Sequence, residues 1–484
     1  MPPADHDCPL TDLVAEQQKR IELLLERSEK QDREIAQLKK ALLGPKSERS
    51  KMPSVQDALG KEPATEESRK ARRREQALRR HALPTVVLEH RVPDEQRSCP
   101  KCGNQTLTPL GDGRTTSVFE YVPAKLVRVQ HVQEVLRCRC GDHVVTAPGA
   151  PKVVEQGRYG ASLLAHLVVA KCVDSIPIYR VEKDFKRQGV PVSRSTLNDL
   201  FHRAASIVEP LSMRLLERVR HRPIVHADET RTRMLDGGNG RPKTGFHWTF
   251  VAEDERGETD VAFVFAADRS GQTPRQVLGG TSGTLLVDAY SGYNAVADVS
   301  SRERAGCHAH LRRYFHEALA TAPIAQEAID LILELYRVEH AAKEQSIVGT
   351  REHLALRKER AGPARDRLKA WLDARQGKEP PKSPLGVAIR YAYAQWTELG
   401  RFLEDARIPL DNNAAERALR RVALGRKNFL FVGDIQAGKN IAGLYSLVAT
   451  CEARGINPLE YLTDVLTRVA DHPNARIDEL LPGA

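Results

Sequence analysis

The stretch Ile224-Val225-His226-Ala227-Asp228-Glu229-Thr230 is an apolar, strand-like run that ends on acidic residues. Similar runs occupy 247–252, 261–266 and 284–288, and the segment 272–278 has the pattern of a helix. Three strands in a meander, then a helix, then another strand is the element order of an RNase H-like α/β core. The sequence therefore predicts a core of this type.

Three acids stand at characteristic places in this pattern. Asp228 ends the first run, Asp288 follows Leu285-Leu286-Val287, and Glu416 lies in Asp411-Asn412-Asn413-Ala414-Ala415-Glu416-Arg417 at the start of a basic helix. Carboxylates that face each other on neighbouring strands raise one another's pKa unless cations lie between them. Two Mg²⁺ or Mn²⁺ ions, about 3.5–4 Å apart, would suit such a set and would promote a phosphodiester reaction. We therefore expect Asp228, Asp288 and Glu416 to be metal-binding catalytic residues.

Each of these acids also has an ordinary structural explanation. An aspartate at the end of a strand is usually a loop or cap residue. Glu416 fits a capping box in which Asn412 or Asn413 caps the helix. Glu229 lies beside Asp228 but points to the opposite face if the strand continues, so it is the weaker candidate.

Basic residues favour a polyanionic partner. The chain of 484 residues has a net charge of +10. The helix after the third acid would bring positive charge to a phosphate backbone through Arg417, Arg420, Arg421, Arg426 and Lys427. The run 69–80, with Arg72, Arg73 and Arg74 at its centre, is either a solvated segment or a second DNA contact.

Four of the eight cysteines form two close pairs that predict a structural zinc site. The first pair, Cys99 and Cys102, is a C-x₂-C knuckle followed by glycine, and the second, Cys138 and Cys140, is one residue shorter. Four thiolates would close a tetrahedral Zn²⁺ site, and His143 could replace a cysteine of the second pair. Four free thiols are the alternative. We see no signal peptide, so a reducing, cytoplasmic location is expected, where paired cysteines favour metal over disulfides.

The remaining patterns divide the chain into regions. Residues 1–45 keep a heptad pattern and predict a coiled coil that pairs protomers, or else an amphipathic helix packed on its own domain. A basic linker at 46–84 and the zinc-binding β module at 85–150 follow. In 151–222, a helix, a Gly-Pro turn and a second helix that starts at Ser193-Arg194 predict a helix-turn-helix-like DNA-binding region, a pattern that any helical hairpin also gives.

The catalytic core is expected to span 223–435, with a helical insertion at 315–404, and a C-terminal helical region covers 436–484. Within the core, Cys307 and His310 have a spacing that could bind a metal. Such a lone pair is weak support, and packing near the core explains it equally well.

Several segments together resemble the transposases of the insertion sequence 66 family. They are HADET at 226–230, VDAYSGYNA at 287–295, GCHAHLRRYF at 306–315 and DNNAAER at 411–417. The heptads, the CPKCG knuckle and the helices around 178–197 share the resemblance, which covers nearly the whole chain in order.

The resemblance implies a DDE-type recombinase in which Asp228, Asp288 and Glu416 are the first, second and third acid. His310 falls on the histidine of the family's W-A-H stretch and would have an accessory role, although His308 stands here in place of the tryptophan. The C-x-C form of the second cysteine pair is the other departure.

The expected activity is metal-dependent cleavage at the ends of a DNA element, followed by strand transfer into target DNA. The expected partners are the element's terminal repeats, target DNA, a second protomer or higher oligomer, and accessory proteins encoded by the element. A bacterial, nucleoid-associated location follows. The sequence has no apolar stretch of about 18 residues, so no membrane span is predicted. Two alternatives are a metal-dependent nuclease or resolvase on the same core, and a zinc-containing DNA-binding regulator with structural acids.

Overall fold

The structure is a computed structural model that describes residues 59, 66–81, 126–137, 144–147, 153, 159–235 and 242–484. The predicted coiled coil at 1–45 lies outside the described residues, as do the predicted zinc ligands Cys99, Cys102, Cys138, Cys140 and His143. The chain divides into two compact units, one of which spans 60–129. In that unit Glu66–His81 forms helix α3, within the predicted basic linker, and its Arg72, Arg73 and Arg74 are exposed.

The other unit is a mixed α/β structure built on a five-stranded sheet with the order β5-β4-β3-β6-β7. Its strands are β3 (Ile224–Leu235), β4 (Pro242–Glu253), β5 (Thr259–Ala266), β6 (Ser282–Val287) and β7 (Ser301–Gly306). The first three form an antiparallel meander, and β6 and β7 run parallel to β3. Helix α7 (Gln272–Leu278) precedes β6 as predicted, whereas β7 is a strand that the sequence analysis missed. A separate two-stranded sheet pairs β1 (Val135–Arg137) with β2 (Val144–Thr146).

The register between β3 and β6 bears on the predicted acids. The two strands pair over three residues, and the last pair is His226 with Leu286. Asp228 and Asp288 each lie two residues beyond this last pair, so they belong to the same end of the two strands. Gly283 permits the close start of β6, because its φ is +111° and a Cβ there would lie 2.1 Å from the carbonyl oxygen of the residue before β3.

Strand β5 lies at one edge of the sheet, where it would expose unpaired backbone groups. Helix α14 (Ile435–Ala453) covers this edge. Ser446 accepts a hydrogen bond from the amide of Phe263 at 2.8 Å, and Thr450 accepts one from Val261 at 3.0 Å. Side chains of α14 therefore satisfy the strand edge and block its pairing with another chain.

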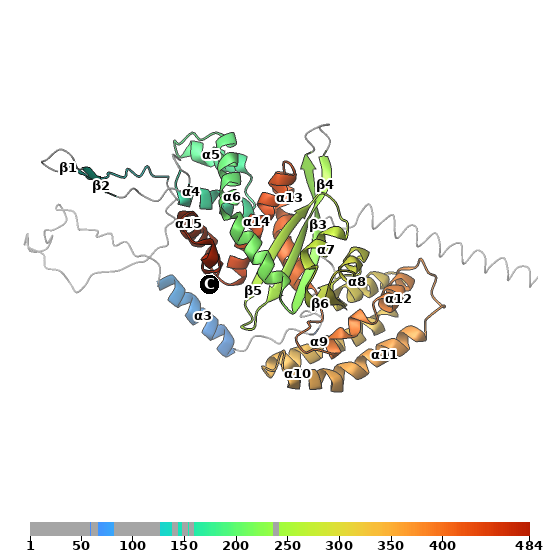
Figure 1. The fold of residues 1–484 in the computed structure, drawn as a ribbon. Coiled ribbons are helices and arrows are strands. Elements are labelled where there is room, and N and C mark those ends of the chain that lie inside the picture. The colour runs from blue at the N-terminus through green and yellow to red at the C-terminus, as the bar shows by residue number, and fades with distance from the viewer. Residues whose placement is uncertain are drawn as a thin grey trace, which may run out of the picture. The chain divides into compact units, whose positions relative to one another are not determined.

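A helical layer packs against β4 and β5 around one shared core (Figure 1). It consists of α4 (Ala161–Cys172), α5 (Ile178–Arg187), α6 (Arg194–Arg220), α14, α15 (Pro458–Arg468) and a 3₁₀ segment at Asn474–Leu480. Ser193 caps α6 by accepting a hydrogen bond from the amide of Thr196, as its sequence predicts. The two helices expected at 178–188 and after 193 are therefore present.

The predicted insertion is helical and begins at His308, seven residues earlier than expected. Its helices are α8 (His308–Ala318), α9 (Ala325–Glu344), α10 (Arg351–Leu356), a π-helical turn (Arg357–Ala361), α11 (Gly362–Asp373), α12 (Pro384–Ala394) and a 3₁₀ segment (Glu398–Leu403). They build their own core around Leu286 of β6 and Ala305 of β7, in the yellow and orange part of Figure 1. The insertion therefore rests on the β6–β7 half of the sheet.

Helix α13 (Asn413–Phe429) returns the chain to β3 after the insertion. Arg426 fixes this contact, because its Nη1 donates to Thr230 Oγ1 and to the carbonyl of Arg231, both at 2.8 Å. The last turn of α13 is thereby held against β3. Among the described helices, none has the length and apolar character needed to cross a membrane.

Candidate active site

The two strand acids are buried in part and lack cationic partners. Asp228 Oδ1 accepts only the amide of the next residue, at 2.8 Å, and Asp288 Oδ1 accepts the amide of Tyr290 at 2.9 Å. Neither carboxylate forms an ion pair within the described part of the chain. Burial, together with the negative charges of Glu229, Asp288 and Glu416, raises the pKa of Asp228 to about 7. Three neighbouring acids therefore raise the pKa of Asp228, and its own carboxylate has no ion-pair partner among the described residues.

Glu416 approaches the strand acids from the first turn of α13. Its Oε1 is buried and has no hydrogen-bond partner in the described residues. The nearest basic groups are the imidazole of His310, with Nδ1 at 3.6 Å, and the guanidinium of Arg313, with Nη2 at 3.7 Å, both on α8. His310 Nδ1 is also buried without a hydrogen bond, and burial lowers the pKa of His310 below its usual value. The structure thus brings His310 to the third acid and adds Arg313, which the sequence analysis missed.

Glu416 has no capping function in this geometry. The N-cap residue of α13 is Asn412, and its amide donates to Cys307 Sγ at 3.2 Å rather than to Glu416. The amide of Asn413 is satisfied by Asp411 Oδ1 at 3.1 Å. Because Asp411 and Cys307 meet these backbone groups, the capping-box explanation of Glu416 is contradicted.

Asn412 connects the segments that carry the first and third acids, a role that its sequence position did not reveal. Its side chain is fully buried, and Nδ2 donates to the carbonyl of Ala227 at 2.7 Å. Its Oδ1 lies 3.1 Å from Nδ1 of His226. Burial lowers the pKa of His226 to about 4. Two side-chain contacts to β3 and one backbone contact to Cys307 hold the start of α13 against the sheet.

Cys307 behaves as a packed thiol. It is buried, and burial raises its pKa to about 12, which disfavours the thiolate that a metal would need. Its sulfur already accepts the Asn412 amide. Of the two explanations for the Cys307–His310 spacing, the structure supports core packing.

Glu229 is neutralised by protein groups, unlike Asp228 beside it. Its Oε1 accepts from Arg269 Nε at 2.7 Å, and its Oε2 accepts from Tyr293 Oη at 2.6 Å. The guanidinium of Arg269 also stacks 4.0 Å from the ring centroid of Tyr290. Glu229 is therefore part of a closed polar cluster, which agrees with its lower rank as a metal ligand.

The basic residues predicted to contact DNA differ in their surroundings. Arg417 and Arg420 of α13 are exposed, as are Lys427 and, at the start of α6, Arg194. The guanidinium of Arg421 donates instead to Glu452 at 2.8 Å and is mostly covered. Four of these groups therefore reach the surface, and Arg421 is engaged inside the protein.

The donor chemistry of the three acids suits a hard divalent cation. They offer carboxylate oxygens, one of them buried without a hydrogen bond, in a place where no guanidinium neutralises the strand pair. Among the residues that the structure describes, no three His, Cys, Asp or Glu side chains are close enough together to hold an ion as they stand. Binding of a cation would thus require the carboxylates to draw together.

Family models match three successive segments of the chain. The zinc-finger binding domain of transposase IS66 matches 96–141, the Transposase IS66 family model matches 156–440, and the IS66 C-terminal element matches 446–482. The first segment contains all four cysteines of the predicted zinc site and stops before His143. The second contains Asp228, Asp288 and Glu416.

Two similar proteins come from Sinorhizobium fredii (strain NBRC 101917 / NGR234). The uncharacterized protein y4jD is 32% identical over 406 residues, which cover 81% of this chain and 78% of y4jD. The uncharacterized protein y4hP is 31% identical over 431 residues, or 84% of this chain and 77% of y4hP. These similarities and the three family models show that the chain belongs to the IS66 family of transposases, whose domains imply DNA transposition.

Proposed function

We propose that this protein cuts DNA at the ends of a mobile element and transfers the freed strands into target DNA, using an RNase H-like core. The strand order β5-β4-β3-β6-β7, with an antiparallel meander and two parallel strands, supports this core type. The observation that carries the proposal is that the charges of Asp288, directly after β6, and Glu416, on α13, both act on Asp228 of β3, while no guanidinium pairs with either strand acid in the described residues.

Asp228, Asp288 and Glu416 would hold Mg²⁺, or Mn²⁺ in its place. When bound, the metal ions supply activation of the attacking oxygen and stabilisation of the leaving oxygen of the phosphodiester. The protein's own contribution is to keep the three carboxylates in one place. Asn412 does so by tying the start of α13 to β3.

His310 and Arg313 are positioned to act on Glu416. His310 Nδ1 is close enough to orient the carboxylate, and the exposed guanidinium of Arg313 can meet a phosphate beside it. Arg417 and Arg420, exposed on the same helix as Glu416, would hold the DNA backbone next to the scissile bond.

The remaining regions would bind and pair the DNA ends. Cys99, Cys102, Cys138 and Cys140 would hold a structural Zn²⁺, as the match to an IS66 zinc-finger model suggests. Arg72, Arg73 and Arg74 on α3, and Arg194 at the start of α6, would contact the terminal repeats. The predicted coiled coil at 1–45 would bring two protomers together on two ends.

Substitution of the second acid tests the proposal. Asp288→Asn should leave binding to terminal-repeat DNA intact and reduce strand cleavage in Mg²⁺ by at least about 1000-fold. The matched control is Asp298→Asn, which changes an exposed aspartate ten residues away and should cleave normally. Undiminished cleavage by Asp288→Asn would overturn the assignment.

A joining assay separates the transposase from a nuclease. DNA that already ends in a free 3′-hydroxyl at the terminal repeat is mixed with supercoiled target DNA and the wild-type protein. The proposal predicts covalent joining of the two. Cleavage of intact ends without any joining would favour a nuclease or resolvase on the same core.

A further inference from the structure

Outside the candidate active site, a cavity of about 650 Å³ lies where α4, α5 and the start of α6 meet the end of α13. Its walls include Lys171, Tyr179, Arg194, Phe429 and Phe431. Of these, only Arg194 has a part in the proposed function. The cavity therefore combines aromatic and cationic groups that so far have no role.

Exposed aromatic side chains are concentrated at this cavity. Tyr179 is 37% exposed and Phe431 is 43% exposed. In the ranges that the structure describes, every other aromatic side chain is buried or half-buried. Because leaving a large aromatic surface in water is unfavourable, two such rings at one cavity indicate a site that binds a flat apolar group.

The backbone at the end of α13 is strained in a way that presents these rings. Leu430 has φ +59° and ψ −44°, and the amide of Phe431 donates to the carbonyl of Phe429 at 2.6 Å. This is the γ-turn with positive φ, which is rare for a residue with a side chain. The turn directs both phenylalanines into the cavity wall, and strain of this kind concentrates at binding sites.

Cations lie among the aromatic rings. The ammonium of Lys171 is 4.3 Å from the ring centroid of Phe201 and 5.6 Å from that of Phe429, and it has no carboxylate partner among the described residues. Burial lowers the pKa of Lys171, and a bound anion would raise it again. Arg180 and Lys183 lie 5.7 and 5.6 Å from the ring of Tyr179. The one acid in the lining, Glu182, accepts the backbone amide of Arg194 at 3.1 Å. The cavity thus offers flat faces with several cationic groups near them.

We propose that this cavity binds an unstacked base of single-stranded or frayed DNA. Tyr179, Phe429 and Phe431 would stack on the base, and the cations at the rim would meet the adjoining phosphates. Aromatic faces together with basic groups are the usual means of binding single strands, whereas a base inside a duplex cannot reach such a cavity.

The proposal rests on the proposed function and adds a place where a strand is held. Helix α13 carries Glu416 in its first turn and Phe429 at its end, about 20 Å apart at ~1.5 Å per residue. That length corresponds to roughly six base pairs of duplex at ~3.4 Å each. A base in the cavity would therefore belong to DNA that is still near the cleavage point.

Binding of an oligothymidylate of about 20 nucleotides, measured by fluorescence anisotropy in EDTA, tests the idea without cleavage. The double variant Tyr179→Ala/Phe431→Ala should bind about 5- to 150-fold more weakly than wild type, whereas Tyr179→Phe/Phe431→Tyr should bind like wild type. With an abasic oligonucleotide of the same length, wild type and the alanine variant should bind equally. Unchanged oligothymidylate binding by the alanine variant, or an equal loss with the abasic strand, would overturn the proposal.

Photocrosslinking locates the contact directly. An oligothymidylate with one 5-iodouracil is irradiated with the full-length protein, and crosslinked peptides are identified by mass spectrometry. The expected adducts lie on the peptides that contain Tyr179 or Phe431, and adducts only elsewhere would contradict the proposal. Asp288→Asn should give the same adducts, so this test can fail while the cleavage assignment holds, and the reverse is equally distinguishable.

Discussion

Two groups of buried acids in this molecule are treated in opposite ways. Asp260 on β5 has a fully buried side chain, and guanidinium nitrogens surround it: Arg218 Nη2 at 2.7 Å, Arg454 Nη2 at 2.7 Å and Arg222 Nη2 at 3.8 Å. Asp228 and Asp288 have no ion-pair partner in the described part of the chain. Burial of a charge is costly unless an opposite charge accompanies it.

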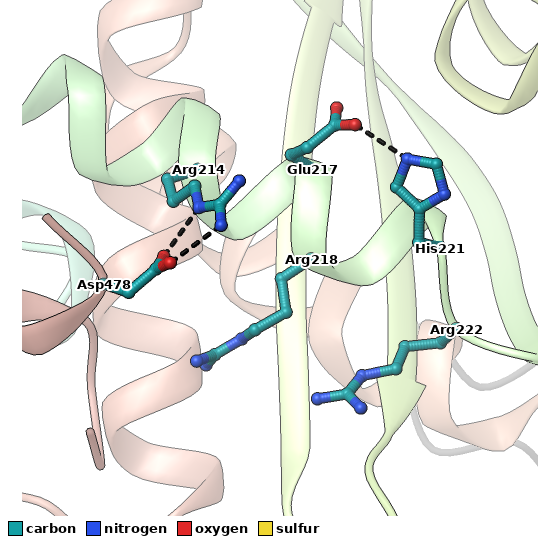
Figure 2. A pocket seen from close by; sticks show the side chains of 6 residues that line it. All are labelled: Arg214, Glu217, Arg218, His221, Arg222 and Asp478. Carbon is teal, nitrogen blue, oxygen red and sulfur yellow. Dashed lines mark hydrogen bonds and ion pairs between the residues drawn. The ribbon is translucent and has the colours of Figure 1, made fainter. Parts of the chain in front are cut away.

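The contrast distinguishes an acid that is neutralised within the fold from the acids that we propose to bind metal. Two of these arginines, Arg218 and Arg222, border a cavity of about 710 Å³ at the end of α6 (Figure 2). This cavity has a basic lining, but Arg214 pairs there with Asp478 at 2.6 Å, and Arg218 is committed to Asp260. The positive charge of these arginines is therefore used to hold the fold. The strand pair Asp228 and Asp288 has no such partner among the described residues, and Glu416 has only the more distant Arg313 at 3.7 Å.

Removal of a cation from the Asp260 cluster should have the largest effect on stability. Arg454→Met leaves a buried carboxylate with less compensation, and we expect the free energy of unfolding in urea to fall by about 3–5 kcal/mol. The control is Arg476→Met, which breaks the exposed ion pair with Glu479 and should leave the free energy of unfolding almost unchanged. Equal, small losses in both variants would remove the contrast.

Removal of the charge at Asp228 should stabilise the protein, whereas removal of a cation beside Asp260 destabilises it. Because its folded-state pKa of about 7 lies above the unfolded value of 3.8, ionisation of Asp228 disfavours the folded state as pH rises through this interval. Asp228→Asn should therefore raise the melting temperature in EDTA by a few degrees above pH 7. The gain in melting temperature should shrink towards about pH 4, because folded wild type then carries a neutral Asp228, as Asp228→Asn carries a neutral asparagine.

The outcome is read by differential scanning fluorimetry over that pH range. Added Mg²⁺ should stabilise wild type more than Asp228→Asn, because the variant has lost one ligand. A lower melting temperature of Asp228→Asn at every pH would show that the aspartate is structural.

A smaller loss is expected at the residue that links the two halves of the acidic site. Asn412→Ala removes the hydrogen bonds to Ala227 and His226, and we expect a loss of about 1–3 kcal/mol in unfolding free energy together with slower cleavage. Asn413→Ala changes a neighbour that is half-buried and should preserve both properties. If Asn412→Ala cleaves as fast as wild type, the link to Glu416 does not position the third acid.

The sequence predicted the parts of the core that depend on local pattern. The apolar runs that became β3, β5 and β6 and the helix at 272–278 were recognisable because their side chains are buried in a regular order. Strand β7 was missed because its sequence is polar. Its Arg302 is buried and donates to the carbonyls of Arg220 and Arg222 at 2.6 and 2.8 Å, which no local pattern indicates.

The candidate site shows the same limit. Asp228 and Asp288 could be identified because each follows an apolar run in the sequence. Asp288 comes directly after β6, whereas β3 continues past Asp228 to Leu235, which the apolar pattern did not indicate. The hydrogen bond from Asn412 to Ala227 joins residues that are 185 apart in the sequence, and Arg313 is near Glu416 only because the fold brings α8 to the start of α13. Contacts between distant segments are fixed by the fold, so only the three-dimensional arrangement distinguishes Glu416 from a capping residue.

Binding of Mn²⁺ to the full-length protein tests the central claim most directly. The free Mn²⁺ signal in electron paramagnetic resonance measures binding at equilibrium without DNA or cleavage, after the zinc site has been saturated with Zn²⁺. The account predicts that wild type and Arg476→Met bind Mn²⁺ alike and that Asp228→Asn and Asp288→Asn each bind at least about tenfold more weakly. Equal Mn²⁺ binding by wild type and both aspartate variants would contradict it.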